Sequence, residues 1–281
     1  MHVMLRYRAA LFAVLLGTLL LTPTPGQASH EAFGIYEDWS QPTIRSDRWR
    51  GIEGFGGQEV KREVQGDKLQ MRFRLEGGTF SDAGAFFADN FLLVTNPVSV
   101  DQLEAEFQVK ALTVTGCPAS PTASRARATR LLITRFNDGT STGPGDRTGD
   151  HFGLVVARRD SNATEEPGIL QLAGAVVRCT NPGCTATTDV AVIVLPQTVQ
   201  VGEPFTLRLI WDQPMRRFLL GVGTDHDVPL HYASSDADPA VLPFAGVQIA
   251  HTAANCRAGP TTVDAETEVG VVYTNVSAIM P

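Results

Sequence analysis

The stretch from Phe205 to Gly223 constrains the fold more than any other part of the sequence. Between Phe205 and Trp211 every second side chain is large and apolar, which is the period of a β-strand with one buried face. Asp212 and Pro214 then supply turn chemistry, and a second apolar run follows. The pattern predicts an antiparallel hairpin whose apolar face must be covered by another layer.

Runs of the same kind recur along the chain at a spacing of roughly ten residues, with turn residues between them. The clearest are Leu69–Glu76 and Leu103–Lys110, in which apolar and polar side chains alternate. After the N-terminal region no long stretch has the 3.6-residue spacing of a helix. With 281 residues, 43% of them hydrophobic, the chain has enough apolar side chains for a sizeable core. The sequence therefore predicts a single all-β domain over residues 29–281, built as an antiparallel sandwich or barrel.

The N-terminus has the features of a secretory signal peptide. Arg6 and Arg8 precede an apolar run, Ala9–Leu21, and small residues precede Ser29. The run is shorter than the roughly 20 residues that a membrane-spanning helix needs, which argues against the alternative of an uncleaved anchor. We expect residues 1–28 to be removed and the mature protein to be secreted, either to the periplasm or outside the cell, without membrane attachment.

Four cysteines suit an oxidising compartment and predict two disulfides. Cys179 and Cys184 flank a Pro-Gly turn, so we expect them to close a hairpin. Cys117 and Cys256 are the remaining pair, and this long-range crosslink would contribute about 4–5 kcal/mol in the chain-entropy account. A zinc site is the alternative, but the spacing lacks the paired C-x-x-C or nearby histidines that such sites show.

Several segments resemble the concanavalin A-like lectin and glucanase group of jelly-roll sandwiches. The segments that carry the resemblance are Glu37–Ser40, Asp47–Trp49, Gln65–Met71, Leu207–Asp212 and Val269–Val276. The resemblance implies two curved antiparallel sheets, with the last strand pairing back to the N-terminal region. It also implies that a sugar can bind on the concave face.

Glycoside hydrolases of that group carry two glutamates and an aspartate on one strand face. The nearest match here is Asp101–Glu106, in which Ala105 replaces the middle aspartate. Retaining glycosidases need two carboxyl groups in defined roles, so this departure argues against catalysis. We interpret Glu104 and Glu106 as a solvated strand face that pairs with Arg72 and Arg74 on a neighbouring strand.

Two further ligand sites are predicted. Members of the group often hold a structural calcium, and oxygen ligands on loops suit that ion. The candidates are Asp225, Asp227, Asp236 and Asp238, with solvated turn residues as the alternative. Trp49, which lies between two arginines, is the candidate for an exposed aromatic ring that stacks on a sugar.

These observations predict a secreted β-sandwich protein without enzymatic activity, with carbohydrate binding as its role and a polysaccharide or glycan as its partner. The formal net charge of −7 repels phosphate backbones, so nucleic acid is not an expected partner. Two alternatives remain open. One is a glycoside hydrolase or lyase whose active site has no recognised motif, and the other is a structural or adhesive exoprotein.

Overall fold

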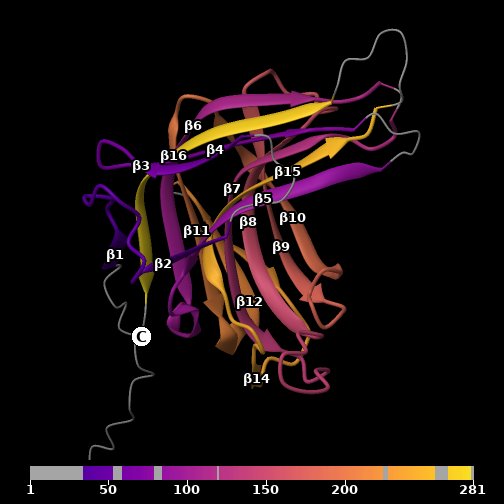
Figure 1. Cartoon of the computed structure of the whole chain (residues 1–281). Coiled ribbons are helices and arrows are strands. Elements are labelled where there is room, and N and C mark those ends of the chain that lie inside the picture. The colour runs from indigo at the N-terminus through magenta and orange to yellow at the C-terminus, as the bar shows by residue number, and fades with distance from the viewer. Residues whose placement is uncertain are drawn as a thin grey trace, which may run out of the picture. The chain divides into compact units, whose positions relative to one another are not determined.

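The computed structural model describes residues 34–52, 59–78, 84–118, 120–223, 227–256 and 265–279, shown as ribbons in Figure 1. They belong to a unit that spans Ala32–Pro281. The predicted signal peptide, residues 1–28, lies outside the described residues and stays a prediction. Within the described part of the chain, no helix is long and apolar enough to cross a membrane.

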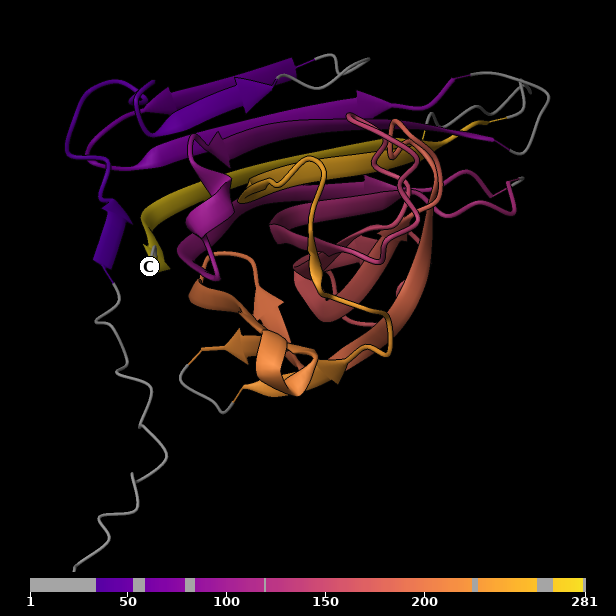
Figure 2. The ribbon, with the colours of Figure 1, turned by 90° about the horizontal axis from the view of Figure 1, so that it is seen from below.

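The described residues form two antiparallel sheets. Sheet A consists of β1 (Gly34–Glu37), β3 (Glu59–Val64), β4 (Leu69–Glu76), β6 (Gln102–Thr115), β11 (Pro204–Asp212), β12 (Arg217–Val222), β13 (Val228–His231) and β16 (Glu266–Ile279). Its strand order is β13-β12-β11-β6-β16-β4-β3, and β1 pairs with β16 beside this path. Figure 2 shows the first strands and the β11–β13 segment, in indigo and orange, at opposite sides of the sandwich.

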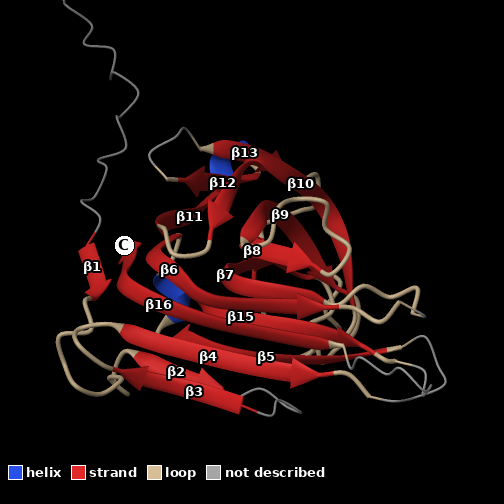
Figure 3. Ribbon diagram, turned by 90° about the horizontal axis from the view of Figure 1, so that it is seen from above, coloured by secondary structure: helices blue, strands red, loops and turns tan. Residues whose placement is uncertain are grey.

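Sheet B consists of β2 (Trp49–Ile52), β5 (Ala85–Val94), β7 (Arg125–Asn137), β8 (Asp150–Asp160), β9 (Ile169–Cys179), β10 (Thr187–Gln200), β14 (Asp238–Pro239) and β15 (Ala245–Ala254). Its order is β10-β9-β8-β7-β15-β5-β2, and β14 pairs with β7. The helical elements among the described residues are two single turns, η1 (Pro97–Ser99) and η2 (Gln213–Met215), drawn in blue in Figure 3. The predicted all-β, antiparallel two-sheet jelly-roll sandwich is confirmed.

The hairpin predicted from the period-two pattern is β11 and β12. Leu209 lies opposite Leu220, and both side chains are fully buried. The connection is η2, after which Arg216 adopts a left-handed backbone with a φ of 48°. The predicted return of the last strand to the N-terminal region is also confirmed, because β1 pairs with β16.

The core lies between the two sheets and follows the strand period. In β4 the four apolar side chains are buried and the residues between them are half-buried or exposed. The largest fully buried side chains come from strands of both sheets and from the segment after β1, and they are Trp39, Tyr273, Phe73, Phe107, Phe136 and Phe218. Burial on this scale, at about 25 cal/mol per Å² of apolar surface, is what holds the two layers together.

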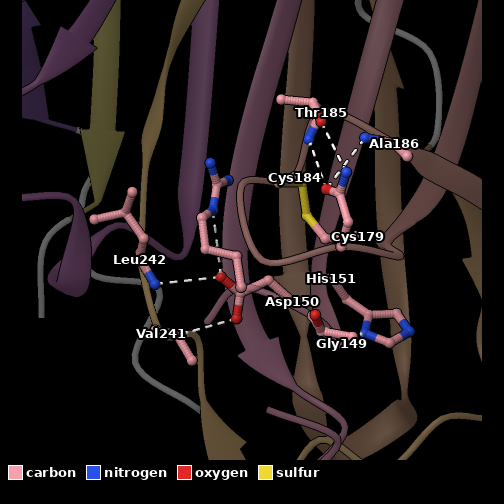
Figure 4. Close-up of a disulfide and its surroundings, with 12 residues drawn as sticks. Gly149, Asp150, His151, Cys179, Cys184, Thr185, Ala186, Val241 and Leu242 are labelled. Carbon is pink, nitrogen blue, oxygen red and sulfur yellow. Dashed lines mark hydrogen bonds and ion pairs between the residues drawn. A yellow bond between two sulfur atoms is a disulfide. The ribbon is translucent and has the colours of Figure 1, made fainter. Parts of the chain in front are cut away.

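One predicted disulfide is present and the other stays a prediction. Cys179, at the end of β9, is bonded to Cys184 across the turn (Figure 4). Cys117 packs against a small buried cluster formed by Ala254, Cys256 and Ala265. The predicted partners Cys117 and Cys256 therefore belong to the same small apolar cluster.

Candidate functional site

The outer face of sheet B, which points away from the core, is unusually apolar. Its side chains form a second buried cluster, separate from the main core, made of Leu132, Phe152, Leu154, Val156, Ala173, Ala175, Val177 and Cys179. In these strands the alternate residues, such as Val155 and Leu172, belong to the main core. Apolar side chains therefore lie on both faces of β8 and β9, and those on the outer face are each at most 8% exposed.

A hollow of about 280 Å³ lies over this face, close to the lower limit of roughly 300 Å³ for ligand pockets. Its apolar floor includes Phe152, Leu154, Val156 and Ala175. Its polar lining is dominated by the arginines of β7 and β8, and these are Arg125, Arg127, Arg130 and Arg158. We name this hollow and its four arginines the arginine face.

A β-bulge in β7 places three of these arginines together. Arg127 and Arg130 are three residues apart, so in a regular strand their side chains would point to opposite faces. The pairing of β7 with β8 shifts between Arg127 and Thr129, and the extra residue leaves both Ala128 and Thr129 buried in the core. The bulge therefore turns Arg130 to the same face as Arg127.

The four guanidinium groups differ in their partners. Arg125 donates to both carboxylate oxygens of Asp160, each at 2.6 Å. The other three donate to neutral side chains, and the bonds are Arg127 to Thr252 at 3.2 Å, Arg130 to Gln248 at 2.6 Å and Arg158 to Gln171 at 3.2 Å. Among the described residues, none of these three forms an ion pair. Three positive charges of the arginine face therefore lack a neutralising carboxylate at contact distance.

The pKa values of Arg127 and Arg130 are lowered, as is typical of cations that are partly buried without a carboxylate in contact. Burial, reinforced by the charges of Arg130 and Arg125, lowers the pKa of Arg127 to about 9. Burial lowers the pKa of Arg130 to about 10, and the charge of Asp89 opposes that change. Burial also raises the pKa of the Asp89 carboxyl, which accepts a hydrogen bond from Gln248 at 3.0 Å. An anion at this face would offset the cost of holding these cations partly buried.

A smaller hollow continues the arginine face along the same strands. It measures about 190 Å³ and shares Arg158 with the first hollow, and its lining is polar, with the two acids Asp160 and Glu165 among it. On the other side Phe87 of β5 is 53% exposed, and the Arg127 guanidinium lies 5.9 Å from its ring centre. The surface is therefore extended rather than a closed cavity.

Two larger hollows have fewer charged side chains in their linings than the arginine face has. One, of about 360 Å³, is lined by residues near Gly34 and Asn96 and includes the charged pair Asp47 and Arg48. The other, of about 340 Å³, lies around Cys117, and no charged side chain is among its lining residues. The arginine face is the hollow in which an apolar floor and several charged donors meet.

The predicted role of Trp49 as an exposed stacking residue is wrong. Its side chain is 3% exposed, and its indole stacks on that of Trp39 with ring centres 5.6 Å apart. Its Nε1 donates to the Glu37 carboxylate at 3.3 Å. Arg50, the next residue of β2, does not expose Trp49 to water, because successive residues of a strand point to opposite faces and Trp49 points inward.

The predicted calcium ligands are not brought together in the described part of the chain. Asp227 pairs with Arg208 at 2.5 Å, Asp236 accepts a hydrogen bond from Tyr232 at 2.8 Å, and Asp238 is exposed on β14. Asp225 lies outside the described residues. Among the described residues, no group of three or more His, Cys, Asp or Glu could hold a metal ion. Asp227 and Asp236 are thus each held by a different protein group rather than gathered around one ion.

Glu104 and Glu106 lie on the outer face of sheet A and do not line the arginine face. Their predicted pairing with Arg72 and Arg74 is wrong, because β16 lies between β6 and β4. Glu104 pairs instead with Arg208 of β11 at 3.3 Å. The two arginines pair with glutamates of β16, Arg72 with Glu268 and Arg74 with Glu266.

No protein-family model matches the sequence, and no curated protein matches it. Solved structures do superpose on the chain. A GlcNAcα1-4Gal-releasing endo-β-galactosidase from Clostridium perfringens superposes over 86% of this chain with 8% identity and a TM-score of 0.44, and this chain spans 61% of the length of that one. A laminarinase from Flavobacterium sp. UMI-01 superposes over 86% of this chain and 98% of its own, with 10% identity and a TM-score of 0.45.

A carbohydrate-binding module from Bacillus subtilis superposes over 75% of this chain and 93% of its own, with 16% identity and a TM-score of 0.34. The assignment of the fold rests on the strand pairing within this chain. Two antiparallel sheets pack face to face, as the concanavalin A-like resemblance implied.

Proposed function

We propose that the protein binds a polysaccharide on the arginine face and does not cleave it. The observation that carries the proposal is the continuous surface on sheet B, where two hollows share Arg158 and combine an apolar floor with fixed polar side chains. A sugar ring has apolar C–H faces and polar edges, so it needs both kinds of contact at once. An extended surface also suits a polymer better than a small molecule, which favours a closed pocket.

The proposal of binding without cleavage rests on the carboxylates near this surface. A glycosidase needs two carboxyl groups about 5–10 Å apart, one of which donates a proton. Asp89 has a raised pKa and is the acid that a hydrolytic alternative would use. Asp160, Glu165 and Asp189 are the acids that line the two hollows. Asp160 accepts hydrogen bonds from Arg125 through both carboxylate oxygens, which leaves Glu165 and Asp189 as the second carboxyl groups that a hydrolytic alternative would use. We propose that the protein binds its ligand after secretion, because residues 1–28 have the pattern of a signal peptide.

Filling the floor of the arginine face should block binding. We expect Ala175→Ile to weaken the binding of a polysaccharide roughly tenfold or more, because the new side chain occupies the space above the floor. The control is Ala111→Ile, the same substitution on β6 of sheet A, which should bind as the wild type does. Affinity electrophoresis against neutral and acidic polysaccharides measures both variants.

Two outcomes would contradict the proposal. Equal affinity of Ala175→Ile and wild type, with both variants folded, would show that the ligand binds elsewhere. Release of new reducing ends from a bound polysaccharide by the wild type, lost in Asp89→Asn, would show that the protein is a hydrolase.

A further inference from the structure

Three of the four guanidinium groups of the arginine face have no carboxylate at contact distance among the described residues. Arg127, Arg130 and Arg158 each donate one described hydrogen bond, and in every case the acceptor is a neutral Thr or Gln side chain. A guanidinium group has five N–H donors in a planar fork, so donors remain for a ligand. The neutral partners fix the orientation of each fork without cancelling its charge.

The outer face of sheet A has a different arrangement of charge. Arginines on the outer face of sheet A are matched by acids, as Arg208 is by both Glu104 and Asp227. The chain as a whole is acidic, with a formal net charge of −7. A polyanion would therefore be repelled by the molecule in general and attracted only where positive charge is concentrated. The residues that line the hollow of the arginine face include four arginines and one acid, Asp189.

The geometry of the arginine groups also selects the kind of anion. A guanidinium fork bonds in bidentate fashion to carboxylate, sulfate or phosphate groups. The apolar floor of Leu154, Val156 and Ala175 lies beside these forks, so the anion must be carried by a body with an apolar face. A sugar ring that bears a carboxylate or a sulfate meets both conditions.

We propose that the glycan bound at the arginine face is acidic, with carboxylate or sulfate groups that pair with Arg127, Arg130 and Arg158. This inference rests on the proposed function, since it names the class of glycan that the same surface takes. The apolar floor receives the ring, and the forks of β7 and β8 receive the charged substituents. Gln248, Thr252 and Gln171 hold the forks in position.

The test compares four probes: polygalacturonate for carboxylate, dextran sulfate for sulfate, and laminarin and dextran as neutral controls. We expect the wild type to bind at least one of the acidic probes at least tenfold more tightly than its neutral counterpart. Arg127→Gln and Arg130→Gln should each weaken that binding roughly tenfold or more, since each removes a charge-assisted contact. The matched control is Arg74→Gln on β4 of sheet A, which should bind as the wild type does.

Additional readouts separate charge recognition from altered folding. Arg127→Lys keeps the charge but loses the fork, so it should recover part of the affinity that Arg127→Gln loses. If the variants of β7 do not fold, Arg158→Gln on β8 gives the same comparison. Binding of the acidic probe should also weaken as the salt concentration rises.

The outcomes distinguish the two proposals. Tight binding of laminarin or dextran that Ala175→Ile reduces and the arginine variants do not change would overturn the acidic-glycan inference and leave polysaccharide binding intact. Acidic probes that bind the wild type and all arginine variants equally would also overturn it. Failure of all four probes to bind would contradict both proposals.

Discussion

Replacement of Asp150 by alanine should lower the free energy of unfolding by about 3–5 kcal/mol, the usual cost of breaking a buried ion pair. The carboxylate is fully buried at the start of β8. It accepts hydrogen bonds from the backbone N–H groups of Val241 and Leu242, at 2.8 and 3.2 Å, which fasten the segment between β14 and β15 to sheet B (Figure 4). It also accepts a bond from Asn137 at 2.8 Å and lies 3.7 Å from Arg147. Alanine leaves the buried N–H groups of Val241 and Leu242 without this acceptor and Arg147 without its carboxylate, while Asn137 keeps its bonds to Ser141 and Thr148.

The expected fall in melting temperature is about 6–20 °C, since each kcal/mol corresponds to roughly 2–4 °C in a chain of this size. Differential scanning calorimetry measures it. The control is Asp47→Ala, which breaks an exposed pair with Arg45 and should hardly change the melting temperature. A melting temperature of Asp150→Ala equal to that of the control would show that this carboxylate does not fasten the segment.

Acid should destabilise the protein through His251, and His251→Leu should remove that part of the effect. The imidazole is fully buried, with its ring centre 5.0 Å from that of Phe73. Burial, reinforced by the charge of Arg127, lowers the pKa of His251 to about 3. In the unfolded chain the same group has a pKa of about 6.5. Below that pH the imidazole is protonated in the unfolded state but stays neutral in the folded state.

The sign of the linkage follows from this difference. The contribution is absent above about pH 6.5, and stability falls by about 1.4 kcal/mol per pH unit as the pH drops from there towards 3. Between pH 7 and pH 5 we expect wild type to lose about 2 kcal/mol more than His251→Leu does. Urea unfolding at the two pH values measures the loss. His231→Leu, at an exposed position on β13, should show the wild-type loss, and an equal loss in wild type and His251→Leu would contradict the account.

The fold could be predicted because its signals are local. The alternation in Leu69–Glu76 and in the β11–β12 hairpin is present in the sequence, and each strand buries the face that its pattern indicates. The Cys179–Cys184 disulfide was predictable for the same reason, since a single turn joins the two residues.

The candidate site depends on strand pairing, which the sequence does not display. Arg125 and Arg127 alternate with alanines, which places these two arginines on one strand face, but Arg130 is three residues further on and would point to the other face of a regular strand. Arg130 reaches the same face only through the bulge, which is a property of the pairing with β8. The predicted partners of Glu104 were wrong for a similar reason. β16, the last strand of the chain, lies between β6 and β4, and the sequence pattern does not show this long-range pairing.

The most direct test of the central claim is to locate the bound glycan on the protein. Leucine, isoleucine and valine methyl groups can be labelled and followed by NMR during titration with oligomers of galacturonate and of laminarin. We predict that the bound oligomer shifts the signals of Leu154, Val156 and Val192, which line the arginine face. The signals of Ile210 and Val272 on sheet A should not move. Shifts on sheet A with none at the arginine face would contradict the account.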